Sequence, residues 1–458
     1  MFTSILANPT PAATSSLLLI PLLTFALAAC GSEPEGDSAA DETGTSTETG
    51  DGDGDGDGDG DGDGDGDGDG DPGDGDGDPG DGDGDGDGDG DGDGDGDGDG
   101  DGDGDGGIVG LATGTGYSCA LRGTGAVACW GFNEYGQLGD GTTTNQLTPV
   151  TVLDLSDAVE IADGSGWFTS CARRMSGAVV CWGRNDHGQL GDGTTTHSET
   201  PVGVSGLVDA VALATGVQHN CALRAGGTVV CWGSNARGQL GDGTMTDSLV
   251  PIAAVGLTDA IAVSAGWRHT CALHPDGSVE CWGGNQNGAL GDGTTDDSLV
   301  PVAVLDLTDA VEIAAGFRHT CARRMSGAVV CWGRNTNGEI GDGTTIDRHT
   351  PVAVVGLADA VELGLGNGWS TCARREPGTV ACWGGNDSGA VGDGTTIDRH
   401  TPVAVVDITD AVEISHGDFH ACARLESGAI MCWGSNGAGG LGDGTLIDRL
   451  TPVPVIGL

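Results

Sequence analysis

Fourteen of the fifteen cysteines form seven pairs, and the second cysteine of each pair lies ten positions after the first. Between Cys171 and Cys181, two runs that can form strands flank Met175-Ser176-Gly177, and three-residue hairpin loops favour a final glycine. Pairing the runs about Ser176 places the cysteines opposite each other, within reach of a disulfide. The spacing predicts seven disulfides: Cys119–Cys129, Cys171–Cys181, Cys221–Cys231, Cys271–Cys281, Cys321–Cys331, Cys372–Cys382 and Cys422–Cys432.

Metal ligation and free thiols are the alternatives for these cysteines. Cys-x9-Cys is not a usual zinc spacing, and oxidising conditions outside the cytoplasm favour disulfides. Free buried thiols remain possible on the sequence alone. Each bridge would stabilise the fold by up to about 2.8 kcal/mol through loop-closure entropy.

Four histidines lie two positions before a first cysteine, namely His219, His269, His319 and His420. A residue that repeats with the scaffold is expected to belong to it, here by holding a turn through a hydrogen bond, in preference to a metal or catalytic role. The tryptophans after the second cysteines are expected to pack between repeats, in preference to forming a substrate-binding ring. They are Trp130, Trp182, Trp232, Trp282, Trp332, Trp383 and Trp433.

The short segment just before each first cysteine varies, and six of its seven copies hold an aromatic residue. Trp, Tyr and Arg are the residues that most often anchor protein interfaces. We therefore predict a binding site there, against the alternative that the rings only fill gaps between repeats. The candidates are Tyr117, Trp167, Trp267, Arg268, Phe317, Arg318, Trp369 and Phe419.

Catalytic motifs are not found in the sequence. It has no Gly-x-Ser-x-Gly, no His-Glu-x-x-His and no pair of carboxylates set apart from the repeat. We therefore expect no enzymatic activity, no catalytic residue, no metal site and no cofactor.

Residues 107–458 repeat with a period of about fifty residues. Each repeat offers four short extended segments and no helical periodicity of useful length, which is typical of a propeller blade. The expected fold is all-β, a seven-bladed β-propeller of four-stranded blades. The predicted repeats are 107–155, 156–207, 208–257, 258–307, 308–357, 358–408 and 409–458.

Each repeat contains Asn-x-x-Gly-x-(Leu/Ile/Val)-Gly-Asp-Gly-Thr, and most place Pro-Val after it and Gly-x-x-His-Thr-Cys-Ala, or a close variant, before it. This pattern resembles the regulator of chromosome condensation repeat family. The resemblance implies a closed seven-bladed propeller, commonly sealed by pairing strands from both chain ends. Ile108–Leu111 and Pro452–Ile456 would meet at that seam. The best-known member is a nuclear exchange factor for a small GTPase, a role that export and acidity make a poor expectation here.

The apolar run at 16–27 is too short for an ordinary transmembrane helix but suits a signal peptide. Leu27-Ala28-Ala29-Cys30 resembles a bacterial lipobox, so residues 1–29 are predicted to be removed and Cys30 to be lipidated. The alternative is an ordinary secretory signal. Gly31 after the cysteine favours the outer membrane or cell surface.

Residues 30–106 are predicted to be a disordered acidic tether, because a Gly-Asp alternation cannot bury a core. Its Asp-Gly repeats match the opening of a calcium loop but lack the closing glutamate, so specific calcium binding is the less favoured alternative.

The formal charge of the chain is −53, and 33 of its 70 acidic residues precede residue 107. The other 37 acidic residues and the 17 arginines give residues 107–458 a net charge of −20. Such a domain repels phosphate backbones, so no nucleic-acid partner is expected. We expect a monomeric, surface-tethered binding module that captures a protein, reaching the membrane only through its lipid anchor. A glycan-binding or glycan-processing propeller is the alternative.

Overall fold

The computed structural model describes residues 106–162, 167–366 and 368–458. These residues form 28 strands in seven four-stranded antiparallel sheets, each built from consecutive strands. The predicted all-β, seven-bladed propeller is therefore confirmed. The predicted signal peptide at 1–29, the lipidated Cys30 and all of the predicted tether except Gly106 lie outside the described residues.

We number the blades 1 to 7 in chain order, and the strands of each sheet fall within one predicted repeat. The first strands are β1 Ile108–Thr113, β5 Ala158–Ile161, β9 Ala210–Thr215, β13 Ala262–Ala265, β17 Ala310–Ala315, β21 Ala360–Leu365 and β25 Ala411–His416. The second strands are β2 Tyr117–Arg122, β6 Thr169–Arg174, β10 His219–Arg224, β14 His269–Leu273, β18 His319–Arg324, β22 Ser370–Arg375 and β26 His420–Leu425.

The third strands are β3 Val127–Gly131, β7 Val179–Gly183, β11 Val229–Gly233, β15 Val279–Gly283, β19 Val329–Gly333, β23 Thr379–Gly384 and β27 Ile430–Gly434. The fourth strands are β4 Gln146–Thr151, β8 Ser198–Gly203, β12 Ser248–Ala253, β16 Ser298–Ala303, β20 Arg348–Ala353, β24 Arg399–Ala404 and β28 Arg449–Pro454.

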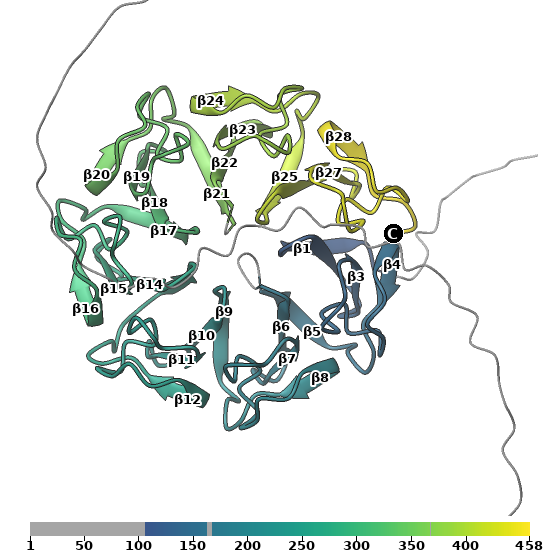
Figure 1. Ribbon diagram of the computed structural model, residues 1–458, viewed down its shortest axis with the longest axis horizontal. Helices are drawn as coiled ribbons and strands as arrows, with labels where there is room; N and C mark the ends of the chain where they lie inside the picture. Colours follow the sequence, from purple (N-terminus) through teal and green to yellow (C-terminus); the bar gives the residue numbers. More distant parts are fainter. Residues whose placement is uncertain (1–105, 163–166, 367) are drawn as a thin grey trace, which may run out of the picture. The chain divides into compact units, whose positions relative to one another are not determined.

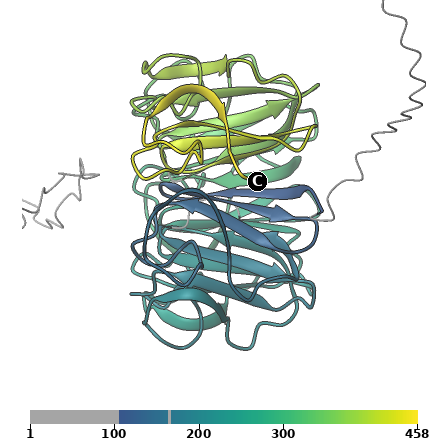
Figure 2. The same ribbon diagram turned by 90° about the vertical axis from the view of Figure 1, so that its right-hand side faces the viewer.

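The blades surround a central axis, with the first strands innermost and the fourth strands outermost (Figure 1). Seen edge-on, the strands run from one face of the propeller to the other (Figure 2). His319 pairs with Gly333, which pairs with Arg348, so the turn before the second strand and the loop before the fourth strand share one face. We call this the turn face, and the opposite side, which carries the hairpins between second and third strands, the hairpin face.

The predicted hairpin is present in every blade. Cys171 faces Cys181 in the β6–β7 register, and Gly177 has a φ of 82°, the left-handed conformation that glycine adopts without strain. All seven predicted disulfides are formed. The free-thiol alternative is thus not what the structure shows.

The seven tryptophans of the third strands are at most 1% exposed and pack against residues of the preceding blade. Each indole Nε1 also donates a hydrogen bond to a backbone carbonyl of that blade, as Trp282 does to Gln239 O at 2.9 Å. A buried polar tip of an aromatic ring needs such a partner. The tryptophans therefore join the blades, as predicted.

The expected pairing of strands from both chain ends in one sheet is wrong for the described residues, although the two segments do meet, because Ile108, Leu111, Val453 and Val455 share one core cluster. Blade 1 consists of β1–β4 and blade 7 of β25–β28, so neither sheet mixes the two ends. The seam is closed by contacts between complete blades, because Leu111 N donates to Glu413 Oε1 at 3.0 Å and Thr113 Oγ1 lies 2.7 Å from Ser415 Oγ. The described residues contain no helix suited by length and hydropathy to cross a membrane.

Candidate functional site

The structure places most of the predicted aromatic residues on the turn face, where they are half-buried. Tyr117 does not join them. It lies on β2 in the position that histidine holds in blade 3, is 5% exposed, and donates its hydroxyl to Thr169 O at 2.8 Å. Burial raises the pKa of Tyr117 above its ordinary value. Tyr117 thus contributes to the contact between blades 1 and 2 and presents no surface to a partner.

Trp267, Arg268, Phe317 and Arg318 come together in the turns of blades 4 and 5, and we call them the aromatic–arginine cluster. The Trp267 and Phe317 rings stack with centroids 4.7 Å apart and planes 25° apart. The guanidinium carbons of Arg268 and Arg318 lie 4.1 and 4.3 Å from the Trp267 ring centroid. Cation–π attraction of this kind orients both guanidinium groups on the indole.

The backbone holds the two turns of this cluster together. Trp267 N donates to Gly316 O at 3.2 Å, and a Cβ on Gly266 would lie only 2.3 Å from the same oxygen. Glycine is therefore required at 266 for the turns of blades 4 and 5 to approach this closely. The sequence pattern of aromatic and glycine residues was a correct signal for the location of this cluster.

A small hollow of about 20 Å³ lies beside the cluster. Its wall includes Arg237, Gln286 and Asn287 from the loops of blades 3 and 4, residues that sequence reasoning missed. Arg237 Nη1 lies 3.2 Å from Asp297 Oδ2, which holds the arginine at the edge of the hollow. The cluster and its rim thus combine an aromatic stack with guanidinium and amide groups.

The remaining predicted aromatics form separate contacts. Trp369 and Phe419 meet edge to face at 6.1 Å in blades 6 and 7. Trp167 Nε1 donates to Asp418 Oδ2 at 3.1 Å, and Phe168 stacks on Tyr135 at 5.1 Å. The two ring contacts each join neighbouring blades, whereas the Trp167–Asp418 bond joins blades 2 and 7. The aromatic residues therefore do not make one continuous ring.

Two buried acids on this face were not predicted. Asp418 is 4% exposed and accepts hydrogen bonds from Thr115 Oγ1 and Trp167 Nε1, and burial raises its pKa to about 6. Glu339 is 1% exposed, and burial raises its pKa to about 7 although Arg334 lies 3.2 Å away. A signal for Glu339 was present, because glutamine occupies its position in blades 1 to 3.

Four glutamates on first strands also escaped the sequence analysis. Each binds an arginine of its own blade at 2.6–2.7 Å and accepts a backbone N–H from the next blade at 2.9–3.3 Å. We call this arrangement the Glu–Arg latch. Its members are Glu160 with Arg173 and Leu213, Glu312 with Arg323 and Leu363, Glu362 with Arg374 and Ile414, and Glu413 with Arg424 and Leu111.

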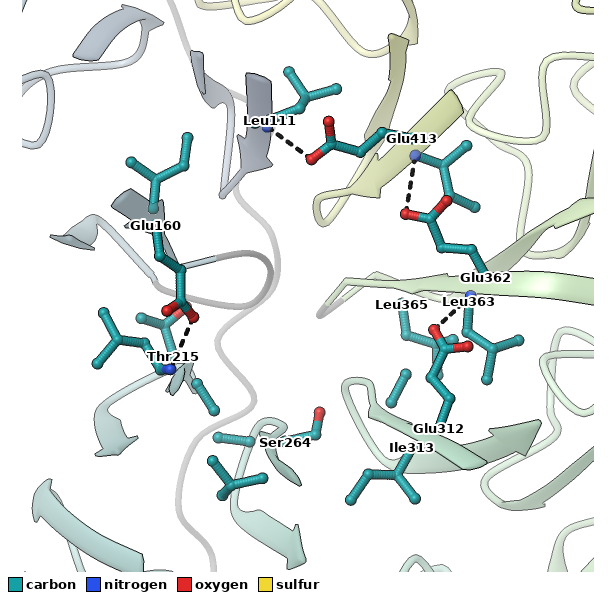
Figure 3. Close-up of a pocket in the computed structure, with 18 of the residues that line it drawn as sticks. Leu111, Glu160, Thr215, Ser264, Glu312, Ile313, Glu362, Leu363, Leu365 and Glu413 are labelled. Carbon is teal, nitrogen blue, oxygen red and sulfur yellow. Dashed lines mark hydrogen bonds between the residues drawn. The ribbon is translucent and has the colours of Figure 1, made fainter. Parts of the chain in front are cut away.

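The four glutamates of the latches line part of a central cavity of about 420 Å³ (Figure 3). Because each carboxylate already binds a guanidinium and a backbone N–H, the four acids hold blades together and do not form a vacant cation site. A sequence signal existed for them. The blades without the glutamate also lack the arginine and pair Gly110 with Leu121, Ala212 with Leu223 and Ala262 with Leu273.

The predicted histidines are structural, but they join blades instead of holding a turn. His219, His269 and His319 place Nε2 2.9 Å from a threonine Oγ1 of the next blade, and His420 lies 2.8 Å from Ser118 Oγ. Each hydroxyl donates its one hydrogen to a backbone carbonyl, as Thr320 does to Ala289 O, so the histidine Nε2 must donate. Burial lowers the pKa of all four imidazoles to about 3 or 4, which keeps them neutral.

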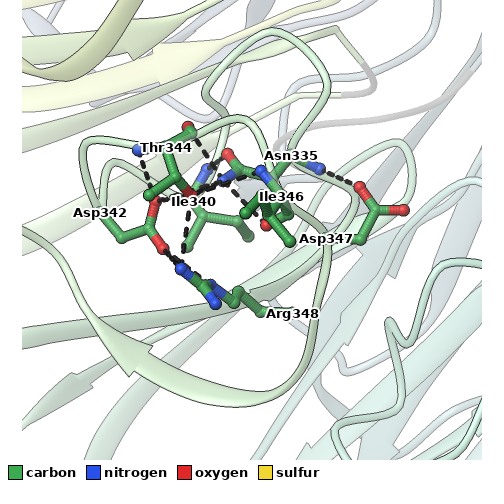
Figure 4. Close-up of polar contacts among 7 residues, drawn as sticks. All are labelled: Asn335, Ile340, Asp342, Thr344, Ile346, Asp347 and Arg348. Atoms are coloured by element: carbon green, nitrogen blue, oxygen red, sulfur yellow. Dashed lines mark hydrogen bonds and ion pairs between the residues drawn. The ribbon is translucent and has the colours of Figure 1, made fainter.

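The Gly-Asp-Gly loops are organised by a buried asparagine. Asn335 Nδ2 donates to Asp342 Oδ1 and to the carbonyls of Thr344 and Ile346, while its Oδ1 accepts Ile340 N (Figure 4). Asp342 also binds Arg348. The carboxylates of this repeated motif thus serve loop structure, and the described residues contain no cluster of three metal-ligating side chains.

Comparison with known proteins supports the repeat assignment. The RCC1-like domain model matches residues 210–458, and models of the regulator of chromosome condensation (RCC1) repeat match 108–137, 124–171 and 176–223. Human E3 ubiquitin-protein ligase HERC2 is 33% identical over 115 residues, which are 24% of this chain and 2% of that protein. Human probable E3 ubiquitin-protein ligase HERC4 is 41% identical over 85 residues, 18% of this chain and 8% of that protein. The chain thus spans only a small part of these relatives.

Solved structures share the fold at low identity. Yeast RCC1 (Prp20), crystallised bound to Kap60, is 20% identical with a TM-score of 0.64, covering 72% of this chain and 83% of that one. Human WBSCR16 is 19% identical with a TM-score of 0.64, covering 72% and 94%. Because the matched RCC1-like domain model alone spans more than half of the sequence, the chain belongs to the regulator of chromosome condensation (RCC1) repeat family.

Proposed function

We propose that the propeller is a protein-binding module that captures its partner through the aromatic–arginine cluster on the turn face. The observation that carries this proposal is the convergence of Arg268 and Arg318 on the stacked Trp267–Phe317 pair. Half-buried aromatic and arginine side chains are the usual anchors of protein interfaces. They lie in turns that differ between blades, whereas the scaffold residues repeat.

Known relatives of this fold support a protein partner. Yeast RCC1 was crystallised with Kap60, and its structure was also described with binding to Gsp1p and histones. Our proposal takes from these proteins only that the fold can bind proteins. It does not extend to nucleotide exchange, because the sequence favours export and an acidic surface.

The cluster geometry favours a protein over a glycan. Phe317, Arg268 and Arg318 all lie within 4.7 Å of the Trp267 ring centroid, so the indole is already packed against three side chains. Stacking on a sugar would require an open aromatic face. Tryptophan and arginine side chains of this kind are the residues enriched at the centre of protein interfaces.

The proposal places the module at the cell surface, tethered through Cys30 and the Gly-Asp segment, and assigns it no catalytic activity. Sequence supports both points through the lipobox resemblance and the lack of catalytic motifs. Radiolabelled fatty acid incorporated into the wild type but not into Cys30→Ala would support the anchor. Equal incorporation would contradict it.

The test of the binding site compares two variants of the full chain as bait for a cell-surface protein extract. Trp267→Ala/Phe317→Ala removes the stack, and Met175→Ala/Met325→Ala changes side chains that are 77% and 78% exposed on the hairpin face. We expect the first variant to lose a captured protein that the second retains, with both variants folded by circular dichroism. If both variants captured the same protein equally well, the proposal would be contradicted.

A further inference from the structure

The loops between third and fourth strands differ at several positions, and one exposed position is apolar in three successive blades. Ile346, Ile397 and Ile447 occupy it in blades 5, 6 and 7, where they are 62%, 62% and 61% exposed. Leu446, next to Ile447, is 55% exposed. The first four blades carry polar residues at this position, namely Thr144, Thr196, Thr246 and Asp296.

The loop does not need an isoleucine to fold. Ile346 O accepts Asn335 Nδ2 at 3.1 Å and Ile346 N donates to Thr344 Oγ1 at 3.3 Å (Figure 4). Thr196 in blade 2 makes the same two backbone bonds, at 3.0 and 3.3 Å. The apolar side chains are therefore extra to the loop structure, and exposed apolar groups on neighbouring elements mark an interaction surface.

Each of these isoleucines is followed by a carboxylate that neutral groups hold. Asp347 accepts Asn335 N and Asn287 Nδ2, both at 2.8 Å. Asp398 accepts Asn386 N at 2.9 Å and Asn337 Nδ2 at 3.2 Å. Amide donors leave the negative charge in place.

The corresponding carboxylates of blades 3 and 4 are held differently. Asp247 lies 3.0 Å from His187 Nδ1, and Asp297 lies 3.2 Å from Arg237. The guanidinium beside Asp297 offsets its charge, and His187 would do the same for Asp247 when protonated. The sector of blades 5 to 7 therefore combines exposed apolar groups with Asp347 and Asp398, which neutral donors hold. The arginines of the same loops, Arg348, Arg399 and Arg449, are paired with other carboxylates, Asp342, Asp393 and Asp443.

The loops of this sector are fixed to one another. Gly343 N donates to His400 O at 2.9 Å, and Gly394 N donates to Leu450 O at 3.0 Å, so each loop binds the next blade. The apolar and acidic groups thus form one surface with fixed spacing. We call it the apolar–acidic row, and its members are Ile346, Asp347, Ile397, Asp398, Leu446, Ile447 and Asp448.

We propose that the apolar–acidic row docks a cationic amphipathic segment of the partner protein. Lys or Arg side chains would face Asp347, Asp398 and Asp448, and apolar side chains between them would cover the isoleucines. The net charge of −20 on residues 107–458 adds long-range attraction for such a segment. This inference rests on the proposed function, because it names the partner's chemistry, yet it uses no residue of the aromatic–arginine cluster.

The test uses methyl NMR of the full chain labelled at isoleucine δ1 positions. The probe is a synthetic amphipathic peptide of leucine and lysine, and the control peptide has glutamate at every lysine. We expect the lysine peptide to shift the Ile346, Ile397 and Ile447 methyls, to leave the buried Ile313 and Ile414 unshifted, and to bind more weakly as salt is raised. Equal binding of the glutamate peptide, or no shift of the row, would overturn the proposal.

A matched variant separates the row from the cluster. Ile346→Thr/Ile397→Thr/Ile447→Thr restores the residue of blades 1 to 3, so the melting temperature should not change while affinity falls at least about tenfold. Trp267→Ala/Phe317→Ala should bind the peptide like the wild type. Peptide binding that is lost in the cluster variant and kept in the row variant would overturn this proposal and leave the proposed function standing.

A second copy of the chain is the other occupant to be tested. Chemical shifts of the row isoleucines that grow with protein concentration in the absence of peptide would show that a second copy covers the row, which would also overturn the proposal.

Discussion

His269 is 1% exposed, and its Nε2 donates to Thr320 Oγ1 in the next blade. Burial lowers its pKa from 6.5 to about 4. The unfolded chain therefore binds a proton at a higher pH than the folded protein, so stability falls as the pH drops from about 6.5 toward 4. His219, His319, His416 and His420 are buried with similarly lowered pKa values and act in the same direction.

His269→Gln tests this linkage at one residue, because glutamine keeps an N–H donor but does not titrate. Between pH 7 and pH 5 the variant should lose about 2 kcal/mol less unfolding free energy than the wild type. Urea unfolding at both pH values measures the difference. Equal losses in the variant and the wild type would show that His269 does not contribute to the pH dependence of stability.

Single-residue roles were only partly predictable from the sequence. The histidines were expected to be structural because they repeat, and the structure agrees, but their partners lie one blade away, which no local pattern contains. Tyr117 was grouped with the surface aromatics because it precedes a cysteine. It lies one or two positions closer to its cysteine than the other aromatics do, which places it in the histidine site, where its hydroxyl donates to a buried carbonyl.

At the scale of elements, the first and second strands of each blade carry facing side chains that suit each other. Blades with a glutamate on the first strand have an arginine opposite, and the other three pair a small residue with leucine. A half-buried carboxylate needs the cation, and without it an apolar pair fills the same space. Either pair, glutamate with arginine or a small residue with leucine, fits the blade. Combining one member of each pair would leave a charge without compensation.

A double-mutant cycle in blade 5 tests this pairing. Arg323→Leu alone leaves Glu312 without its cation and should cost about 1 to 3 kcal/mol of unfolding free energy. Adding Glu312→Ala recreates the pair of blade 4, so the double variant should be closer to the wild type than Arg323→Leu is. Denaturant unfolding at neutral pH provides all four values. Additive losses would show that the two side chains act independently.

Strand hairpins and disulfides could be predicted because a fixed spacing determines a register within one element. The aromatic–arginine cluster was predicted in part, since turn residues were correctly assigned to a variable surface. Its rim residue Arg237 was not, because it comes from a loop that only the pairing of third and fourth strands brings alongside. The Glu–Arg latch was missed for the same reason, although co-occurrence of its residues among the repeats would have revealed it.

For the whole molecule, the repeat predicted the blade count, but the mode of closure was wrong. Every blade is complete without strands from the other chain end, so the ring closes by the contacts that join any two neighbours. Ile108 and Leu458 both pack against the core cluster that contains Trp130 and Cys422. A short linker could therefore join the propeller's two ends, and new ends should be tolerated between other blades.

Circular permutation tests that view at two matched sites. Val255-Gly256 and Val355-Gly356 are exposed Val-Gly pairs at equivalent positions after the fourth strands of blades 3 and 5. Opening the chain at either site leaves all seven sheets whole, so both permutants of residues 107–458 should fold.

The two permutants differ in the bonds that remain across the opened junction. Blades 5 and 6 remain joined by the Glu312–Leu363 and His319–Thr371 bonds, whereas blades 3 and 4 keep His219–Thr270 but have Ala212 in place of the glutamate. The permutant opened at 355 should therefore melt a few degrees above the one opened at 255, since about 1 kcal/mol corresponds to roughly 2 °C in a domain of this size. Calorimetry would measure the order, and a reversed order would show that the latch does not set the strength of the junction between blades.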